Sequence, residues 1–359
     1  MKARSYLFSI FLVAVSFVGC SQYTETINSN RPGVSFGSFS VGKGVLQAEA
    51  GFGFTQWEHE KFNNATVSGQ EYEIALRYGF WKEELEVIWE ATYLMDELTN
   101  TNFSPAVASN RKGFRKHTIG FKYLVFDPFR NVDRYKPNLY SWKANQGIKW
   151  VDLIPAVAVY AGANIVLDET YPFDDVYNEL FYNPFDPLIE PTISPKVAVS
   201  TQNHFKETWV FVTNVSYDRI GTDYPSLSYI LTLTHNLSNP QWSVYLEHQG
   251  IQSDIYSDVL MRGGVAYLVS TDLQLVTSVG SSLKTTPSML TANIGVSYRL
   301  DWHNSEIPQD RRIAKEMRSK AKAEKRLDRN NKKARKKQEK TAKKAAKKRA
   351  KAERKRQKD

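Results

Sequence analysis

The chain has 359 residues, with 48 Lys and Arg, 38 Asp and Glu and a single cysteine. Its charge is divided unevenly: residues 301–359 hold 25 Lys and Arg against 9 Asp and Glu, so this tail carries +16 and the rest of the chain −6. The one cysteine, Cys20, excludes disulfides and cysteine-based zinc sites. The composition therefore predicts one large, mildly acidic domain followed by a basic tail.

The first 20 residues have the pattern of an export signal. Lys2 and Arg4 precede an apolar run from Tyr6 to Val18, which has the length of a signal-peptide core. A transmembrane helix needs roughly 20 apolar residues, and no later segment reaches that length. The signal ends in Phe17-Val18-Gly19-Cys20, which resembles a bacterial lipobox. We expect lipidation at Cys20, with ordinary cleavage nearby as the alternative.

From residue 45 the chain alternates between apolar and polar residues. In 46–55 every second residue is Leu, Ala or Phe, and the residues between them are Gln, Glu, Gly or Thr. Successive side chains of a strand point to opposite faces, so this period indicates β-strands with one apolar face. Twelve segments are predicted as strands: 46–55, 71–80, 84–94, 115–126, 151–166, 192–200, 207–217, 226–235, 241–249, 258–269, 272–280 and 291–300.

Strand length and connection length favour a membrane barrel. A tilted membrane strand needs about 9–11 residues, whereas strands of soluble proteins usually have about 5–6. Connections expected in the periplasm are short (81–83, 201–206, 236–240 and 270–271), apart from 127–150, and those on the opposite side are mostly longer. We therefore predict an all-β fold: an antiparallel transmembrane β-barrel of about 12 strands.

The predicted divisions are a signal peptide (1–20), an N-terminal periplasmic segment (21–44), the barrel (45–300) and a basic periplasmic tail (301–359). A soluble β-sandwich is the alternative. Full charges on the polar face and aromatic residues at strand ends count against the sandwich, because they fit a wet lumen and the aromatic girdles of a membrane protein. The last strand also resembles the signal for outer-membrane insertion, through Gly295, Tyr298 and Leu300.

Several short blocks resemble the outer-membrane transporter family named for a MetA pathway of phenol degradation. The blocks are Asn30-Arg31-Pro32, Gly42-Lys43-Gly44, Gln47-Ala48-Glu49-Ala50-Gly51, Leu76-Arg77-Tyr78-Gly79, Leu85-Glu86, Gly120-Phe121-Lys122-Tyr123, Gln274-Leu275 and Ser278-Val279-Gly280. The resemblance spans roughly 30–300 and implies an outer-membrane barrel that transports solutes, without identifying them. Cys20 and the basic tail depart from the family pattern.

The polar faces of the predicted strands place charges in the lumen. These residues are Glu49, Glu71, Glu73, Arg77, Glu84, Glu86, Glu90, Lys116, Lys122, Arg262 and Arg299. The acidic residues come mainly from the first three strands and the basic residues from later ones, and Arg299 can approach Glu49 when the barrel closes. Such an arrangement could select permeating solutes through a transverse field. It could equally form a salt-bridge network that fills the interior.

Residues 167–191 combine seven acidic with six aromatic residues and contain no Lys or Arg. A packed aromatic loop with solvated acids is the favoured interpretation. The alternatives are a Ca²⁺ site built from carboxylate oxygens, although EF-hand spacing is absent, and a constriction or partner surface at the outer mouth. The six histidines are scattered, so we expect no metal site, no cofactor and no enzyme activity.

The tail is rich in Lys, Arg, Ala and Glu without an apolar stripe, which predicts a helical or disordered segment. Its expected place in the periplasm excludes nucleic acid as a partner and leaves peptidoglycan or an envelope protein, besides the outer-membrane lipid around the barrel. Two functions are therefore open: a passive channel or transporter for small solutes, which is favoured, and a structural or assembly component of the cell envelope tethered by the tail.

Overall fold

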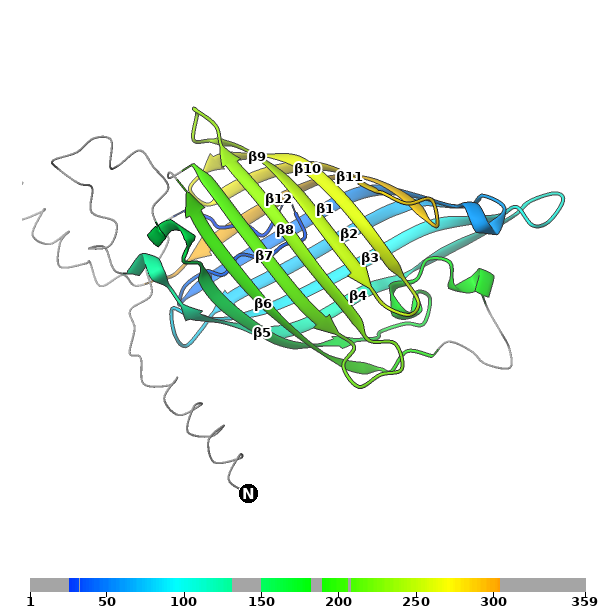
Figure 1. The fold of residues 1–359 in the computed structure, drawn as a ribbon, viewed down its shortest axis with the longest axis horizontal. Coiled ribbons are helices and arrows are strands. Elements are labelled where there is room, and N and C mark those ends of the chain that lie inside the picture. The colour runs from blue at the N-terminus through cyan, green and yellow to red at the C-terminus, as the bar shows by residue number, and fades with distance from the viewer. Residues whose placement is uncertain (1–25, 32, 131–149, 182–188, 206–207, 304–359) are drawn as a thin grey trace, which may run out of the picture. The chain divides into compact units, whose positions relative to one another are not determined.

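The computed structural model describes residues 26–31, 33–130, 150–181, 189–205 and 208–303. Its strands form one closed antiparallel barrel, in which each strand pairs with its neighbours in sequence and the last strand pairs with the first (Figure 1). The predicted barrel of about 12 strands is thereby confirmed. The strands are β1 (Val45–His59), β2 (Ala65–Gly79), β3 (Leu85–Asn100), β4 (Val107–Phe126), β5 (Ala156–Ile165), β6 (Ile193–Phe205), β7 (Trp209–Asp218), β8 (Ser226–Asn236), β9 (Trp242–Gln252), β10 (Ser257–Ser270), β11 (Leu273–Ser282) and β12 (Ser288–Asp301).

Short 3-10 helices lie in the connections. They are η1 (Glu60–Phe62), η2 (Pro128–Arg130), η5 (Trp150–Leu153), η6 (Pro172–Asp174) and η7 (Asn178–Phe181). No helix of the described residues is long and apolar enough to cross a membrane.

The two faces of the barrel wall follow the alternation of the sequence. Phe121 of β4 is 55% exposed, whereas the next residue, Lys122, is fully buried inside the barrel. The same holds on β12, where Ile294 is outside and its neighbour Asn293 lines the interior. The exterior is therefore a continuous apolar surface and the interior is polar, the reverse of a soluble protein.

The even strand count places the start of β1 and the finish of β12 at the same rim, here called the terminal end; the opposite rim is the loop end. At the loop end the hairpins are tighter than the sequence predicted. The expected connections 58–70 and 95–114 shrink to 60–64 and 101–106, because β1 to β4 continue as paired strands of 15–20 residues. These four strands reach beyond the others (Figure 1).

Several predictions fall outside the described residues: the signal peptide, lipidation of Cys20 and nearly all of the basic tail. Residues 131–149 of the long connection between β4 and β5 also lie outside them. These predictions stay predictions.

Candidate functional site

The inner face of the barrel carries the charges that the alternation predicted. Glu49, Glu86 and Lys122 are essentially inaccessible to solvent, and Glu71, Glu73, Glu90, Lys116 and Arg262 line the open part of the lumen. The other two predicted inward residues on strands, Arg77 and Arg299, are also buried, with exposed fractions of 1% and 3%. Glu84 differs, because it lies in the turn before β3 and not on the strand.

The residues of the expected insertion signal lie on β12. Tyr298 and Leu300 are exposed on the outer surface, and Gly295 faces the interior close to Arg31. Arg299 is opposite Gln47 in the register of β1 and β12 and forms an ion pair with Asp301 at 3.4 Å; its approach to Glu49 stays a prediction.

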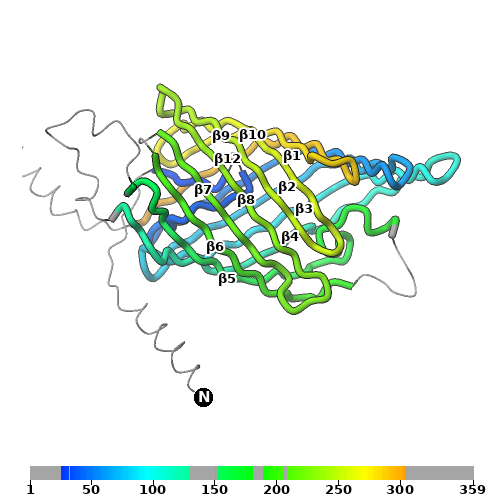
Figure 2. The backbone as a smooth tube through the Cα atoms, viewed as in Figure 1, coloured from blue at the N-terminus to red at the C-terminus, as the bar shows by residue number. Residues whose placement is uncertain are grey.

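A segment before β1 runs through the lumen. We call residues 27–31 and 33–43 the strap. It begins at the terminal end, where the Ile27 amide donates to the carbonyl of Thr271, and it returns to that end, where Lys43 forms a bridge with Gly79 of β2. Between these points it contacts inward-facing side chains around the barrel, and it passes behind β7 and β8 in the view of Figure 2.

The first half of the strap binds the wall formed by β12, β1 and β2. The hydroxyl of Ser29 lies 2.7 Å from that of Ser297 and donates to the Glu49 carboxylate at 3.2 Å. Arg31 forms an ion pair with Glu73. Each contact joins strap and wall through a polar or charged group that would otherwise lose its hydrogen bonds inside the barrel.

The tip of the strap reaches the opposite wall. The amides of Val34 and Ser35 both donate to the Glu247 carboxylate at 3.1 Å. Phe36 and Asn214 form a reciprocal pair, in which the Phe36 amide donates to the Asn214 side chain and the Asn214 amide group donates to the Phe36 carbonyl, both at 2.9 Å. The strap therefore spans the lumen from β1 to β7 and β9.

The returning half of the strap completes a buried charge network. Glu86 forms ion pairs with Arg77 at 3.0 Å and with Lys122 at 2.7 Å. The Lys122 ammonium also donates to the strap carbonyls of Gly37 and Phe39, at 2.7 and 2.9 Å. Buried charges are tolerated when their remaining hydrogen-bonding groups are satisfied, and here the strap backbone satisfies them.

These contacts correct the expected position of the N-terminal segment. The sequence places 21–44 in the periplasm, yet the described part from Ile27 to Lys43 lies within the barrel. The physical reason is that inward carboxylates and lysines need partners, and the strap supplies backbone amides and carbonyls where neighbouring strands do not.

The connection between β5 and β6 covers the lumen at the loop end. We call its described residues, 166–181 and 189–192, the lid. Tyr171, Val176 and Tyr177 are buried in one apolar cluster with residues of β1, β2, β3, β10 and β12, on the far side of the barrel from β5 and β6. The Tyr177 hydroxyl donates to the carbonyl of Ala65 at 3.2 Å. The favoured interpretation, a packed aromatic loop, describes this arrangement.

Several lid acids form ion pairs and are not simply solvated. Asp174 binds Arg115 of β4 at 2.5 Å, and Glu190 binds Arg219 of the turn after β7 at 2.9 Å. Burial alone would lower the pKa of Arg219, but the carboxylates of Glu190 and Asp174 raise it above its ordinary value. Among the described residues no group of carboxylates and histidines could hold a metal ion.

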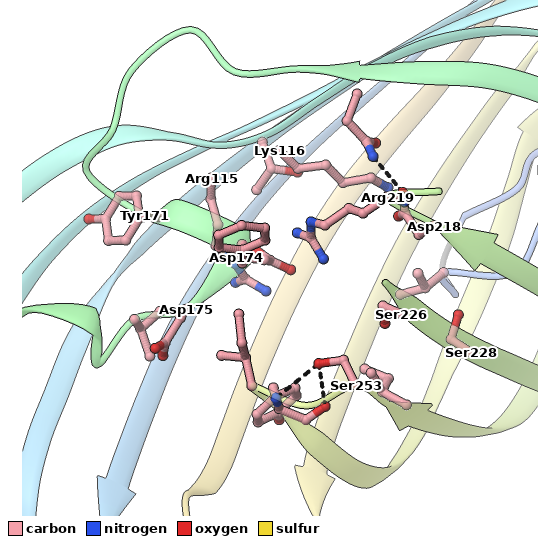
Figure 3. Close-up of a pocket in the computed structure, with 18 of the residues that line it drawn as sticks. Arg115, Lys116, Tyr171, Asp174, Asp175, Asp218, Arg219, Ser226, Ser228 and Ser253 are labelled. Carbon is pink, nitrogen blue, oxygen red and sulfur yellow. Dashed lines mark hydrogen bonds and ion pairs between the residues drawn. The ribbon is translucent and has the colours of Figure 1, made fainter. Parts of the chain in front are cut away.

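Strap and lid enclose a cavity of about 620 Å³. Val34 and Phe36 of the strap lie at its floor, and Tyr171, Phe173 and Tyr177 of the lid border it at the loop end. Its wall carries ion pairs between neighbouring strands, such as Lys116–Glu90 at 2.9 Å and Lys196–Asp218 at 3.3 Å. Figure 3 shows the Arg115, Asp174 and Arg219 side chains converging in this space. A volume of this size accommodates a small organic molecule.

The structure brings most predicted lumenal charges together but adds others that the sequence prediction missed. Lys196 and Glu247 occupy polar positions of predicted strands and could have been found by the same alternation. Arg115 could not, because a β-bulge places it. Asp174 and Glu190 belong to the acidic loop 167–191, for which the sequence offered a Ca²⁺ site or a constriction at the outer mouth as alternatives, but not ion pairs with Arg115 and Arg219. The additional lumenal charges are Asp96, Arg111, Arg115, Asp174, Glu190, Lys196, Asp218, Arg219 and Glu247.

The profile of the family described as "Putative MetA-pathway of phenol degradation" matches residues 29–300. The chain belongs to this family. The match begins within the strap and finishes in β12, so strap and barrel fall within the family's common part, and the suggested resemblance is confirmed. No match was found among curated proteins.

Solved structures with a similar arrangement include proteins described as channels and porins. The COG4313 outer membrane channel from Pseudomonas putida F1 is 10% identical, with a TM-score of 0.45 over 76% of this chain and 100% of that one. The KdgM porin is 7% identical, with a TM-score of 0.38 over 70% and 99%. The CymD monoaromatic hydrocarbon channel is 10% identical, with a TM-score of 0.35 over 73% and 90%.

Proposed function

We propose that this member of the family is a passive channel of the bacterial outer membrane for small solutes, with the terminal end in the periplasm and the lid facing the outside. The observation that carries the proposal is the inverted barrel: an apolar exterior surrounds a polar lumen that contains a cavity of about 620 Å³. A lumen with polar walls and an apolar outer band is the construction of outer-membrane channels.

The channel in this conformation is closed by the strap. Lipid cannot supply hydrogen bonds, so the wall has to stay intact, and flow through the barrel requires movement of strap and lid alone. Contacts such as those of the Glu247 carboxylate with the Val34 and Ser35 amides each stabilise by about 1.5–3 kcal/mol, because the acceptor is charged, so the strap opens only rarely. Thermal opening of the strap then admits solute intermittently.

Uptake into liposomes tests this function. The full chain is reconstituted after its folding is verified by heat-modifiable mobility on a gel, and swelling is followed in neutral solutes of increasing size. We expect swelling above that of protein-free liposomes for the smallest solutes, and a steep decrease with solute size because the cavity is narrow. Swelling indistinguishable from protein-free liposomes for every solute would contradict a channel.

A further inference from the structure

The lid is held at its inner surface by an ion pair between Asp174 and Arg115. The Arg115 Nε atom lies 2.5 Å from the Asp174 carboxylate, and its Nη1 atom lies 3.3 Å from Glu71 of β2. The Asp174 side chain is 40% exposed, whereas that of Arg115 is 17% exposed. Arg115 therefore belongs to the fixed wall, while Asp174 is the accessible partner at the cavity (Figure 3).

The backbone that presents Asp174 is in an unfavourable conformation. Phe173 has φ 56° and Asp174 has φ 68°, both in the left-handed region; Asp adopts this region more readily than most residues, whereas a bulky Phe rarely does. The Phe173 amide donates to the Glu190 carboxylate at 2.6 Å, and the Asp174 side chain binds Arg115. Loss of the second contact would let the backbone return to an ordinary conformation.

Aromatic rings lie beside the arginines at this position. The Arg115 guanidinium is 5.4 Å from the centre of the Trp57 ring, and the Arg219 guanidinium is 5.6 Å from the centre of the Phe173 ring. A guanidinium binds a carboxylate with its planar fork and stacks on aromatic faces. The combination suits a ligand that carries both a carboxylate and an apolar or aromatic body.

We propose that Arg115 is a carboxylate-binding site which Asp174 occupies in the absence of solute, and that a monocarboxylate with an apolar or aromatic body displaces Asp174 and releases the lid. This inference rests on the proposed channel function and names a solute class for its cavity. The group displaced is itself a carboxylate, so an anion replaces it and an ammonium compound does not.

The charge of the cavity restricts the anion to a single carboxylate. Nine acidic and six basic residues line the cavity, so a multiply charged anion such as an organic phosphate meets repulsion from residues that Arg115 does not neutralise. A single carboxylate in place of Asp174 leaves the number of ion pairs unchanged. Glu71 remains on the other edge of Arg115 throughout.

Calorimetric titration of the full chain, folded in detergent, tests the proposal with benzoate, acetate and benzylamine as probes. We expect benzoate to bind more tightly than acetate, and benzylamine not to bind. Asp174→Asn removes the carboxylate that competes with benzoate for Arg115, and the lid backbone can keep its conformation because Asn tolerates a positive φ. The affinity for benzoate should therefore rise by about tenfold, as when a competing closed state is eliminated. Arg115→Gln should lower it by more than about tenfold.

The matched control is Asp223→Asn, which removes the same charge from an exposed residue of the turn between β7 and β8, outside the cavity lining, and should leave benzoate affinity unchanged. The proposal is overturned if Asp174→Asn binds benzoate no more tightly than the unsubstituted chain does. It is overturned as well if neither of these two chains binds benzoate, or if benzylamine binds as tightly as benzoate. Binding is measured without transport, so these outcomes leave the channel function standing, whereas binding without solute uptake would refute the channel instead.

Discussion

At the scale of single residues, Arg77, Glu86 and Lys122 form a buried charge network that holds the strap inside the barrel. All three are inaccessible to solvent or nearly so, and Lys122 reaches Glu86 as well as two strap carbonyls. Taking ions out of water is costly, and the network offsets that cost only while every member is paired. The strap is therefore part of the electrostatic balance of the barrel.

Lys122→Met tests this dependence. The substitution leaves Glu86 with one buried ion pair and leaves the Gly37 carbonyl without the Lys122 donor, while the Phe39 carbonyl keeps only its bond from Arg77; this should cost about 3–5 kcal/mol. We expect heat-modified mobility on a gel to appear at a clearly lower temperature and the strap to become sensitive to protease. Lys112→Met, at an exposed position of the same strand, is the control; equal behaviour of the two variants would refute the role of Lys122.

Arg115 is a residue for which strict alternation predicts the wrong face of the barrel wall. Lys116 faces the lumen by the period of two, so Arg115 should face lipid. A bulge between β3 and β4 inserts an extra residue at this point, with Thr92 opposite Lys116 and Tyr93 opposite Phe114, and Arg115 reaches Glu71 and Asp174 inside. A β-bulge redirects one side chain without changing the surrounding pattern, so the sequence carried no signal for it.

At the scale of elements, each of the 12 strands was predictable because a wall between lipid and water imposes strict alternation. The ends of the strands were less predictable. The N-terminal part of β4 (Val107–Phe126) contains Arg111 and Lys112 and has the composition of a loop, but Arg111 binds Asp96 of β3 at 2.9 Å and the hairpin continues. Cross-strand ion pairs of this kind depend on register, which the sequence alone did not provide.

The strap was not predictable as a lumenal element. Its residues are mostly Ser, Asn and Gly without a period, and it binds the wall largely through its backbone, as at Phe36 and Ser38. Backbone groups are the same in every sequence, so only the unpaired charges on the opposing strands indicate that a partner is needed.

A disulfide between strap and wall tests the position of this element. The hydroxyl oxygens of Ser38 and Ser200 of β6 lie 3.1 Å apart, which is compatible with a bond between cysteines at these positions. We expect Ser38→Cys combined with Ser200→Cys to form an intramolecular disulfide that shifts mobility on a non-reducing gel. The two single variants serve as controls, and a fully free pair of thiols in the folded double variant would place the strap elsewhere.

At the scale of the whole barrel, the interior has two parts, one filled by the strap and one left open as the cavity. Towards the terminal end the strap and the buried charge network occupy the lumen, and towards the loop end the cavity remains open between strap and lid. The sequence left open whether the lumenal charges fill the interior or select solutes. Among the described residues, ion pairs cluster around the strap, as between Glu86 and Lys122, whereas the cavity contains accessible charges such as Asp174.

In the proposed channel, the strap controls flow through the barrel. Single-channel conductance of the full chain is compared with that of a chain that lacks residues 27–41, both verified as folded by heat-modifiable mobility. We expect a several-fold higher conductance and fewer closures without the strap, because no segment then crosses the lumen between the contact of Ser29 with β12 and the contact of Val34 with β9. Equal conductance and equal closing of the two chains would refute control of flow by the strap.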